Sequence, residues 1–116
     1  MNFEDLKDKV LCWADDKDLL HEENAEKQFM KFIEEVFEFK TEMDFDMKFF
    51  KPQFKIWLTD DDIKTEMGDI FVTLIILCKQ IGIDPVKCLE MAYEKISKRK
   101  GRTINGCFVK EEDLED

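Results

Sequence analysis

The hydrophobic pattern of the N-terminal part predicts a first helix. Apolar residues recur there at i, i+3 and i+4 spacing, which places them on one face of a helix. Asn2 is a suitable N-cap with Asp5 three residues later, and the polar run 15–18 is expected to end the helix. The apolar positions of this face are Phe3, Leu6, Val10 and Trp13.

A second helix is expected to open near Glu23 or Asn24 and to run past Met43. Its apolar residues again follow the helical period, and a polar stripe lies beside them. The apolar positions are Phe29, Phe32, Ile33, Val36, Met43 and either Phe39 or the aliphatic stem of Lys40. The neighbouring polar positions are Lys31, Glu35, Glu38 and Glu42.

Residues 43–58 form an unusual insert with two open interpretations. Apolar and charged residues alternate over 45–49 and again over 54–58, which is typical of a strand or an extended arm. The same stretch could instead prolong the second helix, and Pro52 is expected to stop any helix that reaches it.

A third helix has a clear start at Thr59, which is a suitable N-cap. Three aspartates follow it, and their negative charges interact favourably with the positive end of the helix dipole. The stretch 70–78 is apolar almost all round, which is typical of a central helix or one buried between subunits. Gly82 is a plausible terminator. The main apolar face comprises Ile63, Met67, Ile70, Phe71, Leu74 and Cys78.

The fourth helix is predicted to begin with Asp84 as N-cap and Pro85 at the first helical position, and to end at Gly101. Four helices with short connections and no convincing sheet predict an all-α, four-helix-bundle-like domain over residues 1–110, followed by an acidic tail, 111–116. The residues expected to point inward from the fourth helix are Val86, Leu89, Ala92 and Ile96.

Composition narrows the classes of partner. A chain of 116 residues is enough for one domain, and its net charge of −10 argues against nucleic acids and anionic membranes as partners. The four cysteines include no C-x-x-C pair, and the single His21 has no partner at ligand spacing, so a zinc site is not expected. No signal peptide or membrane-spanning run is seen, which fits a reducing cytoplasmic location.

Two acidic pairs carry the candidate chemistry. Glu35 with Glu38, and Glu66 with Asp69, are each spaced i, i+3, so each pair projects from one face of its helix. Such pairs are common on solvated helix faces. However, Asp69 directly precedes the most hydrophobic segment, where a carboxylate is costly unless it is paired or binds a metal. Four carboxylates facing one another would suit a hard divalent cation.

A basic cluster lies near the end of the fourth helix. Lys95 and Arg99 are spaced i, i+4 and share a face. Positive charge at a helix C-terminus is favourable and needs no function. In an acidic protein with a carboxylate cluster, the same cations would also suit phosphate oxygens that a metal bridges.

These residues, taken in order, resemble the MazG-like all-α nucleotide pyrophosphohydrolases, whose pattern is E-E-x-x-E followed by E-x-x-D. The contexts Gly68-Asp69, Arg99-Lys100-Gly101 and Asn105-Gly106 add to the resemblance, which covers roughly residues 10–110. The matching motifs are Gln28-x-x-Lys31-x-x-Glu34-Glu35-x-x-Glu38, Glu66-x-x-Asp69 and Lys95-x-x-x-Arg99.

The resemblance implies a magnesium-dependent enzyme, with Mn²⁺ as a substitute, that cleaves ribo- or deoxynucleoside triphosphates between the α and β phosphates. It also implies a homodimer or homotetramer. By this resemblance Glu34 would support the metal site or orient the attacking water. The implied metal ligands are Glu35, Glu38, Glu66 and Asp69, and the implied substrate-binding residues are Lys95, Arg99, Gln28, Lys31 and Trp13.

Other readings stay open at the level of sequence. A nucleotide- or metal-binding regulator with the same fold would carry the same residues without turnover. A structural bundle whose charge serves solubility is a second alternative. A di-iron carboxylate protein is disfavoured because the Glu-x-x-His spacing is missing.

Overall fold

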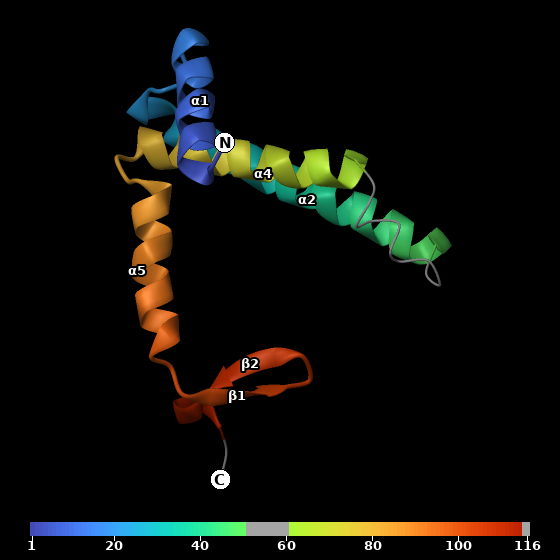
Figure 1. The fold of residues 1–116 in the computed structure, drawn as a ribbon. Helices are drawn as coiled ribbons and strands as arrows, with labels where there is room; N and C mark the ends of the chain where they lie inside the picture. The colour runs from blue at the N-terminus through green and yellow to red at the C-terminus, as the bar shows by residue number, and fades with distance from the viewer. Residues whose placement is uncertain (51–60, 115–116) are drawn as a thin grey trace. The chain divides into compact units, whose positions relative to one another are not determined.

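The computed structural model describes the backbone of residues 1–50 and 61–114, and the side chains of 1–44 and 61–114. Within these ranges the chain is mostly helical, with one small sheet (Figure 1). Its contacts divide it into two compact units, Met1–Ile83 and Asp84–Asp116, and each is described by itself. The elements are α1 (Phe3–Asp16), η1 (Glu22–Asn24), α2 (Ala25–Phe50), α4 (Asp61–Gln80), α5 (Pro85–Ser97), β1 (Gly101–Ile104), β2 (Cys107–Lys110) and η3 (Glu111–Asp113).

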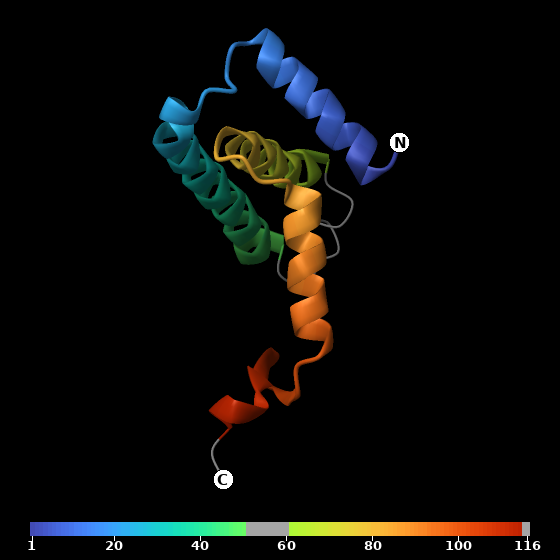
Figure 2. The same cartoon turned by 90° about the vertical axis from the view of Figure 1, so that its left-hand side faces the viewer.

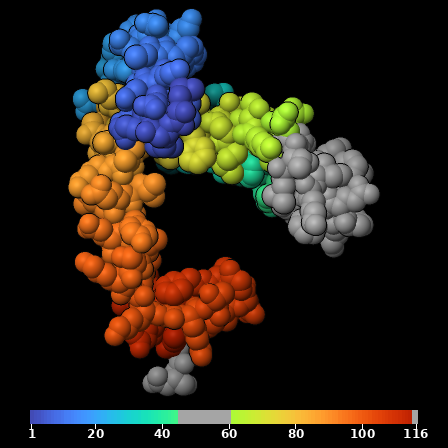
Figure 3. Space-filling view, in the orientation of Figure 1, coloured from blue at the N-terminus to red at the C-terminus, as the bar shows by residue number. Residues whose placement is uncertain are grey.

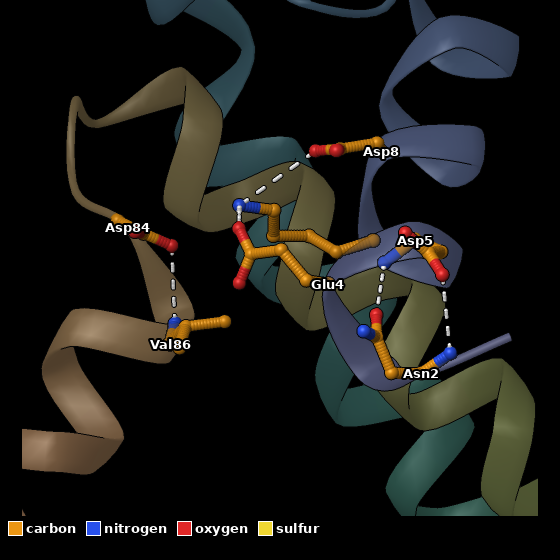
Figure 4. Close-up of polar contacts among 7 residues, drawn as sticks. Asn2, Glu4, Asp5, Asp8, Asp84 and Val86 are labelled. Atoms are coloured by element: carbon orange, nitrogen blue, oxygen red, sulfur yellow. Dashed lines mark hydrogen bonds and ion pairs between the residues drawn. The ribbon is translucent and has the colours of Figure 1, made fainter.

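The start of α1 is a capping box, as the sequence predicts. The Asn2 side chain accepts a hydrogen bond from the Asp5 amide at 2.8 Å, and the Asp5 carboxylate accepts one from the Asn2 amide at 3.3 Å (Figure 4). This exchange satisfies two amides that a helix N-terminus leaves without partners. The helix ends at Asp16, inside the polar run 15–18.

In the first unit, α2 and α4 lie side by side along their lengths, and α1 packs across α4 (Figures 1 and 2). Figure 3 shows the side chains of α1 against those of α4. The Phe3 and Phe71 rings meet edge to face, 6.3 Å between centroids, and join these two helices. The buried apolar side chains of the unit are Ala14, Ile63, Ile75, Ile76 and Cys78.

The buried face of α4 matches the predicted one only in part: Ile63 and Cys78 are buried as expected. Met67 and Phe71, expected to face inward, are 37% and 47% exposed, whereas Thr73, Ile75 and Ile76 are buried. A helix that is apolar almost all round does not reveal its inner face by periodicity, because several faces carry the same signal. Among the described residues, no helix is long and apolar enough to cross a membrane.

The end of α4 follows the prediction. Gly82 takes the left-handed conformation with φ of +80°. Its amide donates to the Lys79 carbonyl, and the Ile83 amide donates to the Cys78 carbonyl at 2.9 Å. These bonds satisfy the last carbonyls of the helix, as glycine commonly allows. The predicted N-cap of this helix, Thr59, lies outside the described residues.

The strand interpretation of the insert is wrong for residues 44–50. α2 begins at Ala25, passes Met43 and continues to Phe50, so this part prolongs the helix. Once a helix is nucleated, each further residue adds a backbone hydrogen bond, and this outweighs a short alternating pattern. Lys40 and Asp44, 2.7 Å apart, add an i, i+4 ion pair. Residues 51–60, including Pro52, lie outside the described residues.

The second unit begins as predicted and then departs from the prediction. The Asp84 carboxylate accepts from the Val86 amide at 3.1 Å, and Pro85 opens α5 (Figure 4). The helix ends at Ser97, not at Gly101. No residue of α5 is buried, so the predicted inward-facing set is wrong; Leu89 is 67% exposed.

The expectation of no sheet is also wrong. β1 and β2 form an antiparallel hairpin in which Gly101 pairs with Lys110 and Ile104 with Cys107. The turn residues Asn105 and Gly106 have φ of 52° and 81°, as a two-residue type I′ hairpin turn requires. The mostly helical chain is roughly compatible with the predicted all-α class, and the hairpin adds a small two-stranded sheet that the prediction lacked.

Candidate functional site

The packing of α2 on α4 brings carboxylates of both helices together. One carboxylate oxygen from each of Glu35, Glu38 and Glu66 lies within 4.8 Å of the other two. Glu35 and Glu38 share a face of α2 because they are one turn apart, and Glu66 reaches the same point from α4. Three of the four predicted metal ligands therefore lie close together. Carboxylates that only solvate a helix face would not need to converge on one point.

Burial makes this cluster unusual. Glu35 is only 7% exposed. One oxygen of Glu35 and one of Glu66, each an Oε2 atom, are buried and have no hydrogen-bond partner among the described residues. A buried carboxylate oxygen without a donor is costly, so the arrangement is suited to a cation that binds both oxygens.

The pKa of Glu66 is raised by its burial and by the carboxylates around it. Burial raises the pKa of this carboxyl above its usual value, and the charges of Asp69, Glu38, Glu35 and Glu42 raise it further. Glu42, which the sequence placed on the same polar stripe of α2, adds to this negative charge but does not belong to the group of three carboxylates.

Lys31 is the cation nearest to the cluster among the described side chains. Its Nζ lies 3.1 Å from Oε1 of Glu35 and 3.9 Å from Oε2 of Glu34. The hydrogen bond to Glu35, followed by the charge of Glu35, raises the pKa of Lys31. Glu34, the predicted water-orienting residue, is exposed and lies outside the group of three carboxylates.

A cavity of roughly 400 Å³ adjoins the cluster in the first unit. It is lined in part by Trp13, Gln28, Lys31, Glu35 and Asp69, which are all residues that the sequence singled out. Asp69, the fourth predicted metal ligand, thus lies in the cavity wall and not in the group of three carboxylates. The remaining lining residues are Leu19, Val72, Thr73 and Ile76.

Gln28 also has a structural bond. Its Nε2 donates to the backbone carbonyl of Thr73 at 3.1 Å, and the Thr73 hydroxyl donates to the Ile70 carbonyl. The first bond joins α2 to α4 beside the cavity. The orientation of the Gln28 amide is therefore fixed, because only its NH₂ group can donate to a carbonyl.

The predicted phosphate-binding residues lie in the second unit. Lys95 and Arg99 line a cavity of roughly 550 Å³ there, together with Lys100, Lys110, Glu111 and Glu112. The sequence reasoning named the first two and missed Lys100 and Lys110. Their proximity depends on the hairpin, whose Asn105-Gly106 turn signal had been present in the sequence.

The carboxylate donor set fits Mg²⁺ or Mn²⁺. Both are hard cations that prefer oxygen ligands, and the cluster offers carboxylates with unpaired buried oxygens. The described residues place no histidine or cysteine in this group. Magnesium usually keeps several waters and takes few protein ligands, so three carboxylates are sufficient for it.

No family model matches the chain, and no solved structure matches it. The chain is 36% identical over 74 residues to an uncharacterized 18.2 kDa protein from the rep-hol intergenic region of Haemophilus phage HP1. The match covers 64% of this chain but only 38% of the phage protein, so the chain spans less than half of that relative.

Proposed function

We propose that this protein is a magnesium-dependent nucleoside triphosphate pyrophosphohydrolase. It would cleave ribo- or deoxynucleoside triphosphates between the α and β phosphates and release a monophosphate and pyrophosphate. The observation that carries the proposal is the convergence of Glu35, Glu38 and Glu66 with two buried, unpaired carboxylate oxygens. The reaction itself is inferred from the resemblance of the ordered motifs to the MazG-like pyrophosphohydrolases.

Three residues would hold the metal directly, namely Glu35, Glu38 and Glu66, with Mn²⁺ as a substitute for Mg²⁺. Asp69, which lines the adjoining cavity, is the fourth ligand by resemblance. When bound, the metal would neutralise phosphate charge and lower the pKa of a water. The protein's own task is then to position the substrate and stabilise charge, as in other phosphoryl chemistry.

The residues around the first cavity would hold the nucleotide. Trp13 offers a flat apolar wall for the base, and Gln28 fixes one side of the cavity through Thr73. Lys31 pairs with Glu35 of the cluster and also lines the cavity, so it can meet an anionic group of the substrate. Glu34 is assigned to supporting the metal site or orienting the attacking water, since it lies beside Lys31.

Further parts of the proposal rest on the resemblance. Lys95 and Arg99 are assigned to the substrate phosphates, which the cationic lining of their cavity supports. The helices are proposed to form a MazG-like bundle in a homodimer or homotetramer. A cytoplasmic location is proposed, and neither nucleic acid nor membrane is proposed as a partner.

The direct test is a panel of ribo- and deoxynucleoside triphosphates incubated with the purified protein and Mg²⁺, with products identified by ³¹P NMR. We expect monophosphate and pyrophosphate, and no turnover in EDTA. A diphosphate with orthophosphate would contradict α–β cleavage. Magnesium-dependent nucleotide binding without turnover would favour the regulatory alternative.

A further inference from the structure

The charge of the chain is strongly segregated. The stretch from Lys95 to Lys110 contains six lysine and arginine residues and no aspartate or glutamate, although the whole chain has a net charge of −10. A dense positive segment in an acidic protein attracts anions locally, because nearby charges act most strongly over roughly one Debye length, about 8 Å.

Four of these cations surround one cavity. Lys95 and Arg99 come from the last turns of α5 and the residues after it, Lys100 directly precedes β1, and Lys110 ends β2. Glu111 and Glu112 from η3 complete the lining. All the lining residues belong to the second unit, so this unit forms the cavity by itself.

The backbone holds the hairpin lysines in place. Gly101 pairs with Lys110 in the ladder, and the Glu111 amide donates to the Lys100 carbonyl at 2.7 Å. A Cβ on Gly101 would lie 2.1 Å from the Val109 carbonyl oxygen, so glycine permits this close approach. Lys100 and Lys110 are therefore brought to one cavity by fixed backbone geometry.

The cations outnumber their internal partners. Among the described residues, the ion pair in this cavity is the one between Lys110 Nζ and Glu112 Oε1, at 3.9 Å. Such a long, exposed pair contributes little to stability. Four cations face two carboxylates, so the lining keeps an excess of positive charge.

We propose that this cavity binds an oligophosphate, a chain of two or three anhydride-linked phosphates, and that Lys100 and Lys110 hold it together with Lys95 and Arg99. A volume of roughly 550 Å³ lies in the range of small-molecule sites and exceeds the needs of a single ion. The cations come from several elements, so an extended anion can contact more of them than one phosphate can. Glu112 competes with the ligand for Lys110.

Two sources would supply this chemistry. The ligand is the triphosphate of a nucleotide or free inorganic pyrophosphate. Naming a nucleotide or pyrophosphate as the ligand rests on the proposed function. The proposal that the cavity binds an oligophosphate does not. A nucleic acid is disfavoured because the acidic remainder of the chain repels a long polyanion.

The test measures binding in EDTA, so that it depends on neither a divalent metal nor turnover. Calorimetry with the full chain uses inorganic tripolyphosphate, pyrophosphate and orthophosphate. We expect tripolyphosphate or pyrophosphate to bind at least about tenfold more tightly than orthophosphate. Tighter binding of tripolyphosphate would identify the substrate's phosphate chain, and tighter binding of pyrophosphate the product; either order supports the site.

Matched variants separate the site from general charge. The double variant Lys100→Gln/Lys110→Gln should weaken tripolyphosphate binding at least tenfold. The control Lys98→Gln/Arg102→Gln removes the same charge from the same segment but from residues outside the lining, and should change binding about twofold or less. Glu112→Gln should tighten binding about twofold, because a competitor is removed.

Several results would overturn the proposal: no binding of tripolyphosphate or pyrophosphate, equal binding of orthophosphate, equal losses in the two double variants, or tighter binding of a short single-stranded oligonucleotide. If the Lys100→Gln/Lys110→Gln variant fails to fold, the site is tested by NMR chemical-shift changes when tripolyphosphate is added to the unsubstituted protein. They must include the amides of Lys100, Lys110 and Glu112. If the protein turns over nucleotides in the panel but binds neither tripolyphosphate nor pyrophosphate in EDTA, the oligophosphate site is refuted while the proposed function stands.

Discussion

Three carboxylates that meet at one point make a sharp prediction for single residues. Under the proposed function, Glu38→Gln and Asp69→Asn should each lower turnover of nucleoside triphosphates by about 10- to 100-fold, because changes at and around metal sites typically have effects of this size. Circular dichroism and the oligomer size should stay unchanged. Glu26→Gln, an exposed carboxylate in the first turn of α2, is the matched control and should retain activity. Near-normal turnover in either site variant would refute the ligand set.

The single histidine gives a prediction that concerns pH. A hydrogen bond and the charge of Asp18 raise the pKa of His21 above its usual value. The protonated form is thus favoured in the folded state, so the contribution of the pair to stability is complete below the unfolded pKa of about 6.5 and is lost as the pH rises through the folded value. Asp18→Asn should lower the pKa of His21 in an NMR titration.

Asparagine is the informative replacement there. Asp18 has φ of 58°, a conformation that asparagine tolerates, so the variant removes the charge without adding backbone strain. The chain contains one histidine, and its ring signals can be followed without ambiguity. An unchanged pKa in Asp18→Asn would show that the pair does not form in solution.

At the scale of elements, two glycines differ sharply in their surroundings. A Cβ on Gly68, inside α4, would meet no atom within 4 Å, so Gly68→Ala should stabilise the protein by about 0.5–1 kcal/mol through helix propensity. On Gly101 a Cβ would collide with the Val109 carbonyl, and Gly101→Ala should destabilise the hairpin by about 1–3 kcal/mol.

Urea denaturation of both variants, with hydrogen exchange of the β1 and β2 amides, checks this pair of predictions. The loss in Gly101→Ala should be localised to the hairpin. Stabilisation by Gly101→Ala, or loss of stability in Gly68→Ala, would contradict the backbone geometry described for these two positions.

The elements whose ends depend on local chemistry could be predicted from the sequence. Asn2, Gly82 and Asp84 act through hydrogen bonds or backbone conformations within a few residues, and each lies where the sequence placed it. The pairing of Glu35 with Glu38 on one face of α2 could also be predicted, because the helical period fixes which side chains share a face, whereas their meeting with Glu66 depends on the packing of α2 on α4.

The remaining features depend on information beyond a local period. The continuation of α2 over 44–50 and the buried face of α4 are decided by packing between helices, for which alternation and all-round apolarity are poor guides. The hairpin does not follow from the hydrophobic pattern, although Asn105-Gly106 is a strong turn signal, because short exposed strands carry little such pattern. Asp69 and Glu34 show that spacing alone does not separate a ligand from its neighbours.

At the scale of the whole molecule, α5 bears apolar side chains that its own unit leaves exposed, including Leu89, Tyr93 and Ile96. The homo-oligomer that the resemblance implies would bury such a face. We expect the protein to elute as a dimer or tetramer in size-exclusion chromatography with light scattering. Leu89→Glu should shift it towards the monomer while helicity is retained. A monomeric unsubstituted protein at micromolar concentration would refute this assembly.

The ion pair of Lys31 with Glu35 has a consequence for the order in which ligands act. Under the proposed function, the metal and the lysine compete for Oε1 of Glu35, which lies 3.1 Å from Nζ. A substrate phosphate that attracts Lys31 would release this oxygen, so nucleotide binding should tighten Mg²⁺ binding, and thermodynamic linkage requires the reverse effect to be equal. Calorimetric titration of Mg²⁺ with and without a non-hydrolysable nucleotide should show this coupling, and Lys31→Met should reduce it. The lysine would then make the metal site responsive to the presence of substrate.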